Sequence, residues 1–279
     1  MKTVKLSDLN NRLPFGYNDN GNLTKPFELK RYKLSVDRDL ALWMKENNID
    51  ETSRNFVFKK VAKLMHLLVE RVGNKTFVKH QDKVSTVRDE LLIKDLYATD
   101  IIYLLLKARI ASAGELYETI GKCNACEHHD LVELDLNTLE FKTTDSVNDL
   151  QKWVELKHPF TSVTGEKITH LRLRTEKFSD VVSDNLETYT FLDTLQNCIN
   201  GINNKTEVIH LLPEDVDEID RGDLYALQLA FSELSGVDLS FELPCPHCKS
   251  GRLEAGVNWT LENFFMSSSQ LMGGKNTNS

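Results

Sequence analysis

The sequence lacks the long apolar run that a membrane-spanning helix requires. Its longest apolar runs, Ile101–Leu106 and the His210-interrupted Val208–Leu212, fall far short of the roughly 20 residues needed. The opening residues, Met1–Lys5, lead into polar sequence, so we expect no signal peptide. With 41% apolar and 27% charged residues and a mean hydropathy of -0.36, the composition is typical of a soluble globular protein. This composition excludes a wholly disordered chain. Because we expect no signal peptide, we expect the protein to work in the compartment where it is made.

The sequence also lacks an excess of basic residues. Lysine and arginine number 34 against 42 aspartates and glutamates, which gives a net charge of -8. Proteins that bind nucleic acid usually carry a basic patch and often a basic total, so this balance disfavours that class. A local patch is still compatible with the net charge, because net charge does not describe its distribution.

No catalytic motif is present. The sequence has no Gly-x-Gly-x-x-Gly, no phosphate-binding Gly-x-x-x-x-Gly-Lys-Ser/Thr, no His-Glu-x-x-His and no Gly-x-Ser-x-Gly. We interpret the acidic run Glu214–Asp220 as the solvated first turn of a helix, with a cation site as the alternative. Similarly, we interpret Arg172, Arg174 and Lys177 as a solvated strand face, with contact to phosphate or an acidic partner as the alternative. The sequence therefore predicts a protein that is not an enzyme.

Cysteine is scarce, and four of the five cysteines fall in two Cys-x-x-Cys pairs. The pairs are Cys123 with Cys126 and Cys245 with Cys248. In an intracellular chain such pairs indicate metal or redox chemistry rather than a disulfide framework. The fifth, Cys198, lies in an apolar-periodic stretch, and we expect it to be a buried, unreactive thiol.

The two pairs occupy the same place in a repeated pattern. A predicted helix over Asp100–Ser112, with Thr99 or Asp100 as its N-cap, precedes the first pair, and a predicted helix over Asp223–Leu234 precedes the second. The first cysteine follows the helix-starting aspartate by 23 residues in one case and 22 in the other. Predicted strands, in which apolar and polar residues alternate, flank each pair. We therefore interpret the pattern as an internal duplication of helix, strand, Cys-x-x-Cys and strand. Two such units suggest a pseudo-two-fold pair.

Two Cys-x-x-Cys hairpin tips together supply four sulfurs, which matches the tetrahedral preference of Zn²⁺. We therefore predict a structural zinc site formed by Cys123, Cys126, Cys245 and Cys248. Three alternatives stay open: the tips hold no metal, each tip binds its own ion, or the pairs are redox-active. The second would recruit a histidine from His128, His129 or His247. The third is suggested by the Pro-His dipeptide between Cys245 and Cys248, but the helix that lowers thiol pKa values in oxidoreductases is not predicted there.

The fold class that these patterns predict is α+β, with duplicated helix and β-hairpin units of zinc-ribbon type and a helical N-terminal region. We expect residues 1–35 to be largely irregular and residues 186–200 to form a helix. We divide the chain into an N-terminal arm and helical region (1–95), a duplicated zinc-bearing domain (96–266) and a flexible tail (267–279). An apolar cluster before the tail is a candidate for core packing or, alternatively, for docking a neighbouring subunit; it comprises Trp259, Phe264, Phe265 and Met266.

Several motifs resemble those of the baseplate hub assembly proteins of T-even-like contractile-tailed bacteriophages, with relatives in Mu-like phages. The resemblance is most specific at the helix that begins with Asp100 and runs through Arg109-Ile110-Ala111-Ser112 to Gly114, and continues through Tyr117 into the first cysteine pair. Weaker matches complete it: Leu13-Pro14-x-Gly16, Cys245-Pro246-x-Cys248 and Glu262-Asn263-Phe264-Phe265.

This resemblance implies a non-enzymatic, chaperone-like or structural role in assembling the tail baseplate. The implied partners are hub or wedge proteins, and the implied location is the host cytoplasm during assembly or the virion tail. The competing hypothesis is a zinc-ribbon regulator that binds nucleic acid. Six basic residues close in sequence motivate it: Lys59, Lys60, Lys63, Arg71, Lys75 and Lys79.

Overall fold

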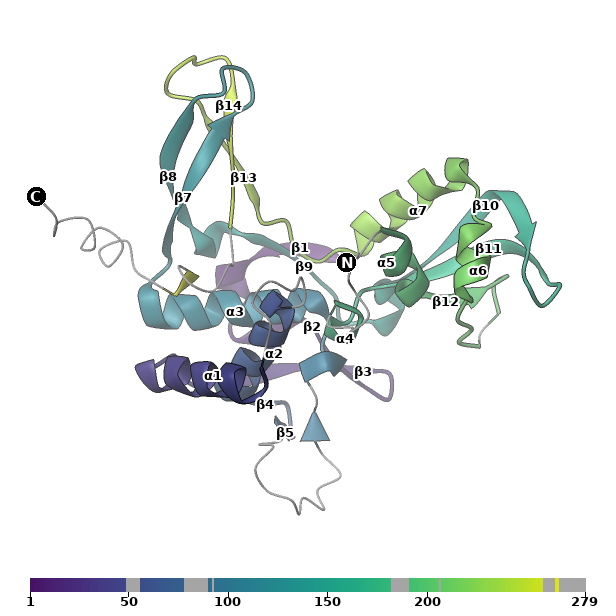
Figure 1. Ribbon diagram of the computed structural model, residues 1–279, viewed down its shortest axis with the longest axis horizontal. Coiled ribbons are helices and arrows are strands. Elements are labelled where there is room, and N and C mark those ends of the chain that lie inside the picture. Colours follow the sequence, from purple (N-terminus) through teal and green to yellow (C-terminus); the bar gives the residue numbers. More distant parts are fainter. Residues whose placement is uncertain are drawn as a thin grey trace, which may run out of the picture.

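The computed structural model describes residues 1–48, 56–77, 90–91, 93–181, 191–205, 207–257 and 264–265. Helices and strands alternate through the chain and form four separate sheets, so the fold is α+β (Figure 1). Among these residues no helix combines the length and apolar character needed to cross a bilayer.

A five-stranded sheet occupies the N-terminal part of the chain. Its order is β2-β3-β4-β5-β6. The strands are β2 (Arg12–Asp19), β3 (Asn22–Leu29), β4 (Val69–Val72), β5 (Lys75–Phe77) and β6 (Glu90–Leu91). The expectation that residues 1–35 are largely irregular is wrong, because the turn-forming residues around Asn20 and Gly21 close a tight β2–β3 hairpin. Both residues have positive φ angles, 52° and 90°, which asparagine and glycine tolerate.

Three helices pack with this sheet into the largest hydrophobic core of the described residues. They are α1 (Leu34–Glu46), α2 (Phe56–Leu68) and α3 (Ala98–Ala113). The central helix α3 is buried on nearly all sides, as its continuous apolar sequence predicts. Its N-cap is Tyr97, so the prediction of Thr99 or Asp100 as the cap is wrong; both residues lie inside the first turn, and Asp100 bonds elsewhere.

Two β-hairpins form an arm that projects from the body of the molecule (Figure 1). The four strands pair in the order β13-β14-β7-β8. They are β7 (Leu116–Cys123), β8 (His129–Asp135), β13 (Ser240–Pro244) and β14 (Arg252–Gly256). The hairpins pair with each other at only two positions, Leu253 with Cys123 and Glu254 with Lys122. A hairpin from the middle of the chain and one from its C-terminal part thus meet at one point near their tips.

A three-stranded sheet with its own helices forms the second hydrophobic core. Its strands are β10 (Gln151–Thr161), β11 (Lys167–Arg174) and β12 (Ile199–Ile202). Three helices contribute to it: α5 (Phe191–Cys198), α6 (Pro213–Asp217) and α7 (Arg221–Leu234). The short helix α4 (Phe178–Val181) instead buries Phe178 in the first core. The helix expected over 186–200 ends at Cys198 and passes directly into β12. Here a buried apolar strand overrides helical periodicity.

The remaining elements are short. Strand β1 (Lys2–Lys5) pairs with β9 (Glu140–Thr143). Four 3₁₀ helices complete the described fold: Leu6–Leu9, Ile93–Asp95, Leu136–Thr138 and Val147–Leu150. The first core draws on residues from Leu6 to Phe141, on Phe178, and again on residues from Cys245 to Phe264. The second core lies within 154–234. The expected division at residues 95 and 266 stays a prediction.

The basic strand face is less exposed than predicted. The acidic run begins helix α6, as predicted, and its acidic side chains are exposed except for that of Asp215. The Arg174 guanidinium donates to both carboxylate oxygens of Asp180, at 2.7 and 2.9 Å. The Arg172 guanidinium donates to the side-chain and backbone oxygens of Asn200, at 3.0 and 2.8 Å. In the acidic run, Asp215 is buried and accepts a hydrogen bond from the Val163 N–H at 2.8 Å. The solvated interpretation is wrong for these side chains, because each holds internal backbone or side-chain partners.

Candidate metal centre

Each Cys-x-x-Cys pair lies in the turn of one arm hairpin. The first turn joins β7 to β8, and the second joins β13 to β14. In both turns the residue after the second cysteine, Glu127 or Lys249, has a left-handed backbone, with φ of 57° and 59°. Its N–H donates to the carbonyl of the first cysteine, at 3.0 Å for Cys123 and 3.2 Å for Cys245. The two tips therefore share one local conformation. This agrees with the sequence pattern, which predicts a hairpin turn at each cysteine pair.

The two tips bring all four sulfurs into one cluster. The Sγ atoms of Cys123 and Cys248 are 3.7 Å apart, and those of Cys126 and Cys245 are 3.9 Å apart. All four lie within 4.8 Å of one another. Cysteines separated by 119 residues in the chain, Cys126 and Cys245, thus become neighbours. The four thiols are free rather than disulfide-bonded.

These separations fit a single tetrahedral zinc ion. Zinc–sulfur bonds of about 2.3 Å in a tetrahedron place sulfurs about 3.8 Å apart. The two measured cross-tip distances lie on either side of that value. The four residues thus have the chemistry and the spacing to hold one Zn²⁺, which would crosslink the two hairpins. The set contains no histidine; the rings of His128 and His247 stack on each other, with centroids 4.9 Å apart.

Backbone N–H groups point at the sulfurs, as thiolate ligands require. The Ala125 N–H lies 3.4 Å from the Cys123 sulfur, and the Gly251 N–H lies 3.3 Å from the Cys248 sulfur. Hydrogen bonds from Ser250 and from the Gly251 N–H lower the pKa of Cys248 to about 6. The His128 N–H acts to lower the pKa of Cys126, but burial and the neighbouring thiols raise it to about 12. Thiols this close together do not all ionise readily, because the negative charges of their thiolates repel one another. A bound cation would offset that repulsion.

The tips also lock together through backbone contacts beside the sulfurs. The Asn124 N–H donates to the Arg252 carbonyl, and the Arg252 N–H donates to the Asn124 side-chain oxygen, both at 3.0 Å. Gly251 lies between the two tips, at a position where there is no room for a side chain. A Cβ at this position would lie 2.7 Å from the Cys123 sulfur and 2.6 Å from the Ala125 Cβ. The glycine therefore permits the close approach of the two tips.

Neither cysteine pair opens a helix. The residues after Cys248 turn into β14 and those after Cys126 turn into β8. The helix dipole that depresses a thiol pKa in redox-active pairs is thus missing at both positions within the described chain. This geometry gives the redox alternative no support.

Two buried aspartates, which sequence reasoning treated only as helix starts, anchor the helices that precede the hairpins. Both oxygens of Asp100 accept backbone N–H bonds at 2.9 Å, from Phe15 and Gly16 in β2. Asp223 accepts the consecutive N–H groups of Lys157 and His158 in β10, at 2.8 and 2.9 Å. An aspartate one turn into an otherwise apolar helix is the signal that could have identified them.

The electrostatics of the two anchors differ. Burial raises the pKa of Asp100 to about 7, against the opposing effect of the two N–H groups and of Lys25. Burial also acts to raise the pKa of Asp223, but its two N–H donors and the nearby His158 ring outweigh that effect and lower it. Asp223 lies nearer solvent than Asp100, because the His158 side chain beside it is 60% exposed.

The apolar cluster near the C-terminus packs inside the chain where it is described. Phe264 is 1% exposed and lies against Tyr117, with ring centroids 6.1 Å apart. Phe265 stacks on Tyr32, with centroids 4.3 Å apart. The other two candidates, Trp259 and Met266, lie outside the described residues. Subunit docking by this cluster stays a prediction, and it would require both rings to leave these contacts.

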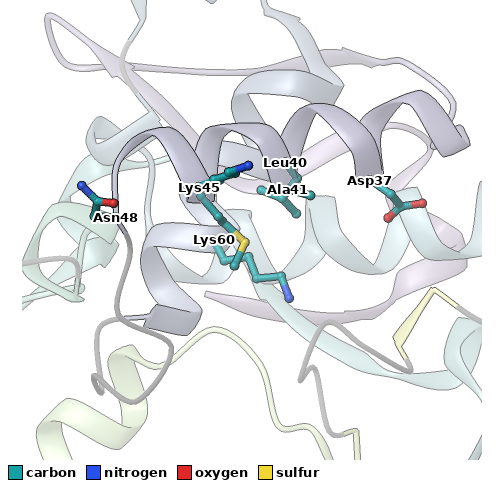
Figure 2. Close-up of a pocket in the computed structure, with 7 residues that line it drawn as sticks. Asp37, Leu40, Ala41, Lys45, Asn48 and Lys60 are labelled. Atoms are coloured by element: carbon teal, nitrogen blue, oxygen red, sulfur yellow. The ribbon is translucent and has the colours of Figure 1, made fainter.

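Two further features of the surface group polar side chains without forming a site. A pocket between α1 and α2 is lined by side chains that spread along α1 rather than converge (Figure 2). Its lining residues are Asp37, Leu40, Ala41, Met44, Lys45, Asn48 and Lys60. The Nδ1 atom of His158 lies 3.4 Å from carboxylate oxygens of Asp220 and Asp223. Asp220 already accepts the Gly222 N–H at the start of α7, and Asp223 already accepts N–H groups of β10, so the group is explained by helix anchoring.

Comparison with known proteins gives one match, and it covers most of the chain. The family model described as T4 bacteriophage base plate protein matches residues 39–266. No curated protein and no solved structure matches the chain. The matched range contains α3, the arm and all four clustered cysteines. The chain therefore belongs to the family of T4-like bacteriophage baseplate proteins.

Proposed function

We propose that this chain is a non-enzymatic assembly component of the phage tail baseplate, acting on the hub in a chaperone-like or structural way. The family match carries the baseplate assignment. The site geometry supports a structural role, because a metal bound by four sulfurs has no open position for substrate or water. In this proposal the protein contacts hub or wedge proteins in the host cytoplasm and reaches the virion tail with them.

The proposal includes a structural zinc ion held by Cys123, Cys126, Cys245 and Cys248. What supports it is the sulfur separation, together with the N–H groups aimed at two of the sulfurs. The ion would supply a crosslink between hairpins that share only two paired positions. Because the unfolded chain has no preformed site, metal binding would contribute directly to folding.

We further propose that the whole chain, and not only its cysteine hairpins, is an internal duplication. One copy would comprise β2–β3, α2–β4, α3 and β7–β8, and the other β10–β11, α5–β12, α7 and β13–β14. In each copy a helix passes without a loop into the third strand of an antiparallel trio. The paired anchors Asp100 and Asp223, each bound to two consecutive N–H groups of a copy's first strand, support the same alignment. Between the second strand and the helix that enters the third, the first copy has α1 and the second has the short α4.

The proposed function can be tested in infected cells. A phage that lacks this gene should accumulate incomplete baseplates, and the wild-type gene supplied on a plasmid should restore complete tails. A tagged chain should recover hub or wedge proteins from the cells in which tails assemble. Mass spectrometry of purified virions then distinguishes a subunit that stays in the particle from one that leaves.

Two results would contradict the proposal. One is normal tail assembly in the absence of the gene. The other is failure of the tagged chain to associate with any tail intermediate. A plasmid carrying Cys123→Ser tests the metal separately, since it should fail to complement if the sulfur centre is required, whereas Cys198→Ser, outside the cluster, should complement.

A further inference from the structure

The outward face of the β7–β8 hairpin exposes an apolar pair in the middle of the arm. Ile120 and Leu131 stand directly opposite each other on the two strands and are 67% and 60% exposed. Leu116, further along β7 on the same face, is 44% exposed. The opposite face of the hairpin is buried, through Tyr117, Val132 and others, so the exposed side chains are not part of a core. The outward face is therefore a candidate contact surface.

The same face is acidic and its charges are not neutralised. Glu118 and Glu133 form a directly opposed cross-strand pair beside Ile120 and Leu131. Like charges in this arrangement destabilise a hairpin. Neither carboxylate has an ion-pair partner within the described ranges. Lys122, at the tip end of the same face, is the nearest cation along β7, and it is paired with Glu127 at 3.6 Å.

We infer that this face, defined by Leu116, Glu118, Ile120, Leu131, Glu133 and Asp135, docks another baseplate protein through an apolar side chain flanked by lysine or arginine. The inference rests on the proposed function for its choice of partner. Its physical basis is charge complementarity: a basic partner relieves the Glu118–Glu133 repulsion while it covers the apolar pair. A second copy of this chain would bring two acidic faces together, and nucleic acid would be repelled.

The position of the face fits this role. The arm projects from the body, so a partner reaches the face without displacing any other element (Figure 1). The sulfur cluster lies at the end of the same two strands, where it would hold the hairpin in a fixed orientation. A preorganised strand pair loses little conformational freedom on binding.

The test uses the full-length chain and the phage's other baseplate proteins, purified singly and titrated against it. Ile120→Thr with Leu131→Thr removes the apolar pair and places β-branched residues, which favour strands, at both positions. This double variant should weaken binding of the partner by about tenfold or more, because two buried apolar contacts are lost. The matched control is Val163→Thr, which alters a residue that is 58% exposed in the β10–β11 turn; it should leave binding unchanged.

A charge reversal separates binding from folding. Glu118→Lys converts the like-charge pair into an attractive one, so the melting temperature should stay the same or rise while partner binding weakens about tenfold or more. Wild-type binding should weaken with added salt. Glu155→Lys, at an exposed position of β10, is the control and should change neither affinity nor its salt dependence.

The outcomes separate this inference from the proposed function. If a baseplate protein binds the chain and neither arm variant changes its affinity, the docking face is wrong and the function stands. If none of the baseplate proteins binds, both fail. If the wild type self-associates and Ile120→Thr with Leu131→Thr abolishes the self-association, the face joins copies of this chain, and the inference of a basic partner is overturned.

Discussion

The number of zinc ions per chain can be measured through the stability of the fold. A ligand that binds only the folded state adds RT ln(1 + [L]/Kd) to the free energy of unfolding. Above the Kd, each tenfold increase in free zinc therefore adds about 1.4 kcal/mol for each ion bound. The sulfur geometry, with both cross-tip pairs near the separation for a single tetrahedral ion, predicts a slope for one ion.

The assay is urea unfolding of the purified chain in solutions whose free zinc is buffered over several decades. Two independent ions, one at each tip, would give about 2.7 kcal/mol for each decade, and a metal-free pair of tips would give no slope. The single-site prediction thus differs from each alternative by more than the error of the method. Elemental analysis of the same samples should give one zinc per chain.

Cysteine variants make the prediction stricter. Because Cys123 and Cys245 belong to different tips of one centre, replacing either by serine should weaken zinc binding and lower stability to a similar extent. Cys198→Ser should keep the full slope, since Cys198 lies away from the cluster. If Cys123→Ser halves the slope and leaves the second tip responsive to zinc, the shared centre is refuted.

Three other predictions concern Gly251 at the hairpin tips and Asp100 in α3. Gly251→Ala should weaken zinc binding about tenfold or more in a chelator competition, because the new Cβ would lie 2.7 Å from the Cys123 sulfur; unchanged affinity would contradict the close packing of the tips. Asp100→Ala leaves two buried N–H groups unpaired and should lower the free energy of unfolding by about 2–6 kcal/mol, measured in urea, while the exposed Asp39→Ala should cost less than about 0.5 kcal/mol. The pKa of Asp100 is raised to about 7, so the folded state binds more protons than the unfolded state between about pH 4 and 7. This residue's contribution to stability should therefore fall as pH rises through that window. An Asp100→Asn variant that retains the same pH dependence would exclude Asp100 as the source.

The cysteine arrangement was predictable because it depends on local rules. A helix, a strand, a cysteine pair and a second strand occur twice at nearly equal spacing, and each step of that pattern has a local physical cause. The structure brings together the four cysteines that this argument selected. No comparable signal marked Gly251, whose role depends on how closely the other tip approaches.

The N-terminal sheet and the helix anchors could not be predicted in the same way. Strands β2 and β3 contain turn formers and prolines. What makes them strands is that β3 pairs with β4, 40 to 45 residues later in the sequence, and β2 pairs in turn with β3. Asp100 lies where an N-cap is expected by sequence, yet its carboxylate bonds to N–H groups 84 and 85 residues earlier. Both depend on tertiary partners that the local sequence does not specify.

The two arm hairpins share little pairing with each other, and this explains the position of the sulfur centre. An isolated two-stranded hairpin is marginally stable in water, and each arm hairpin has only one face to bury. The two hairpins share a backbone seam of two residue pairs, which includes Cys123 and Lys122. The sulfurs lie beside this seam, at the point where the hairpins would otherwise separate most easily. A metal crosslink there would supply the rigidity that a larger core gives elsewhere, and the apolar, acidic face on β7–β8 would depend on that rigidity to meet its partner.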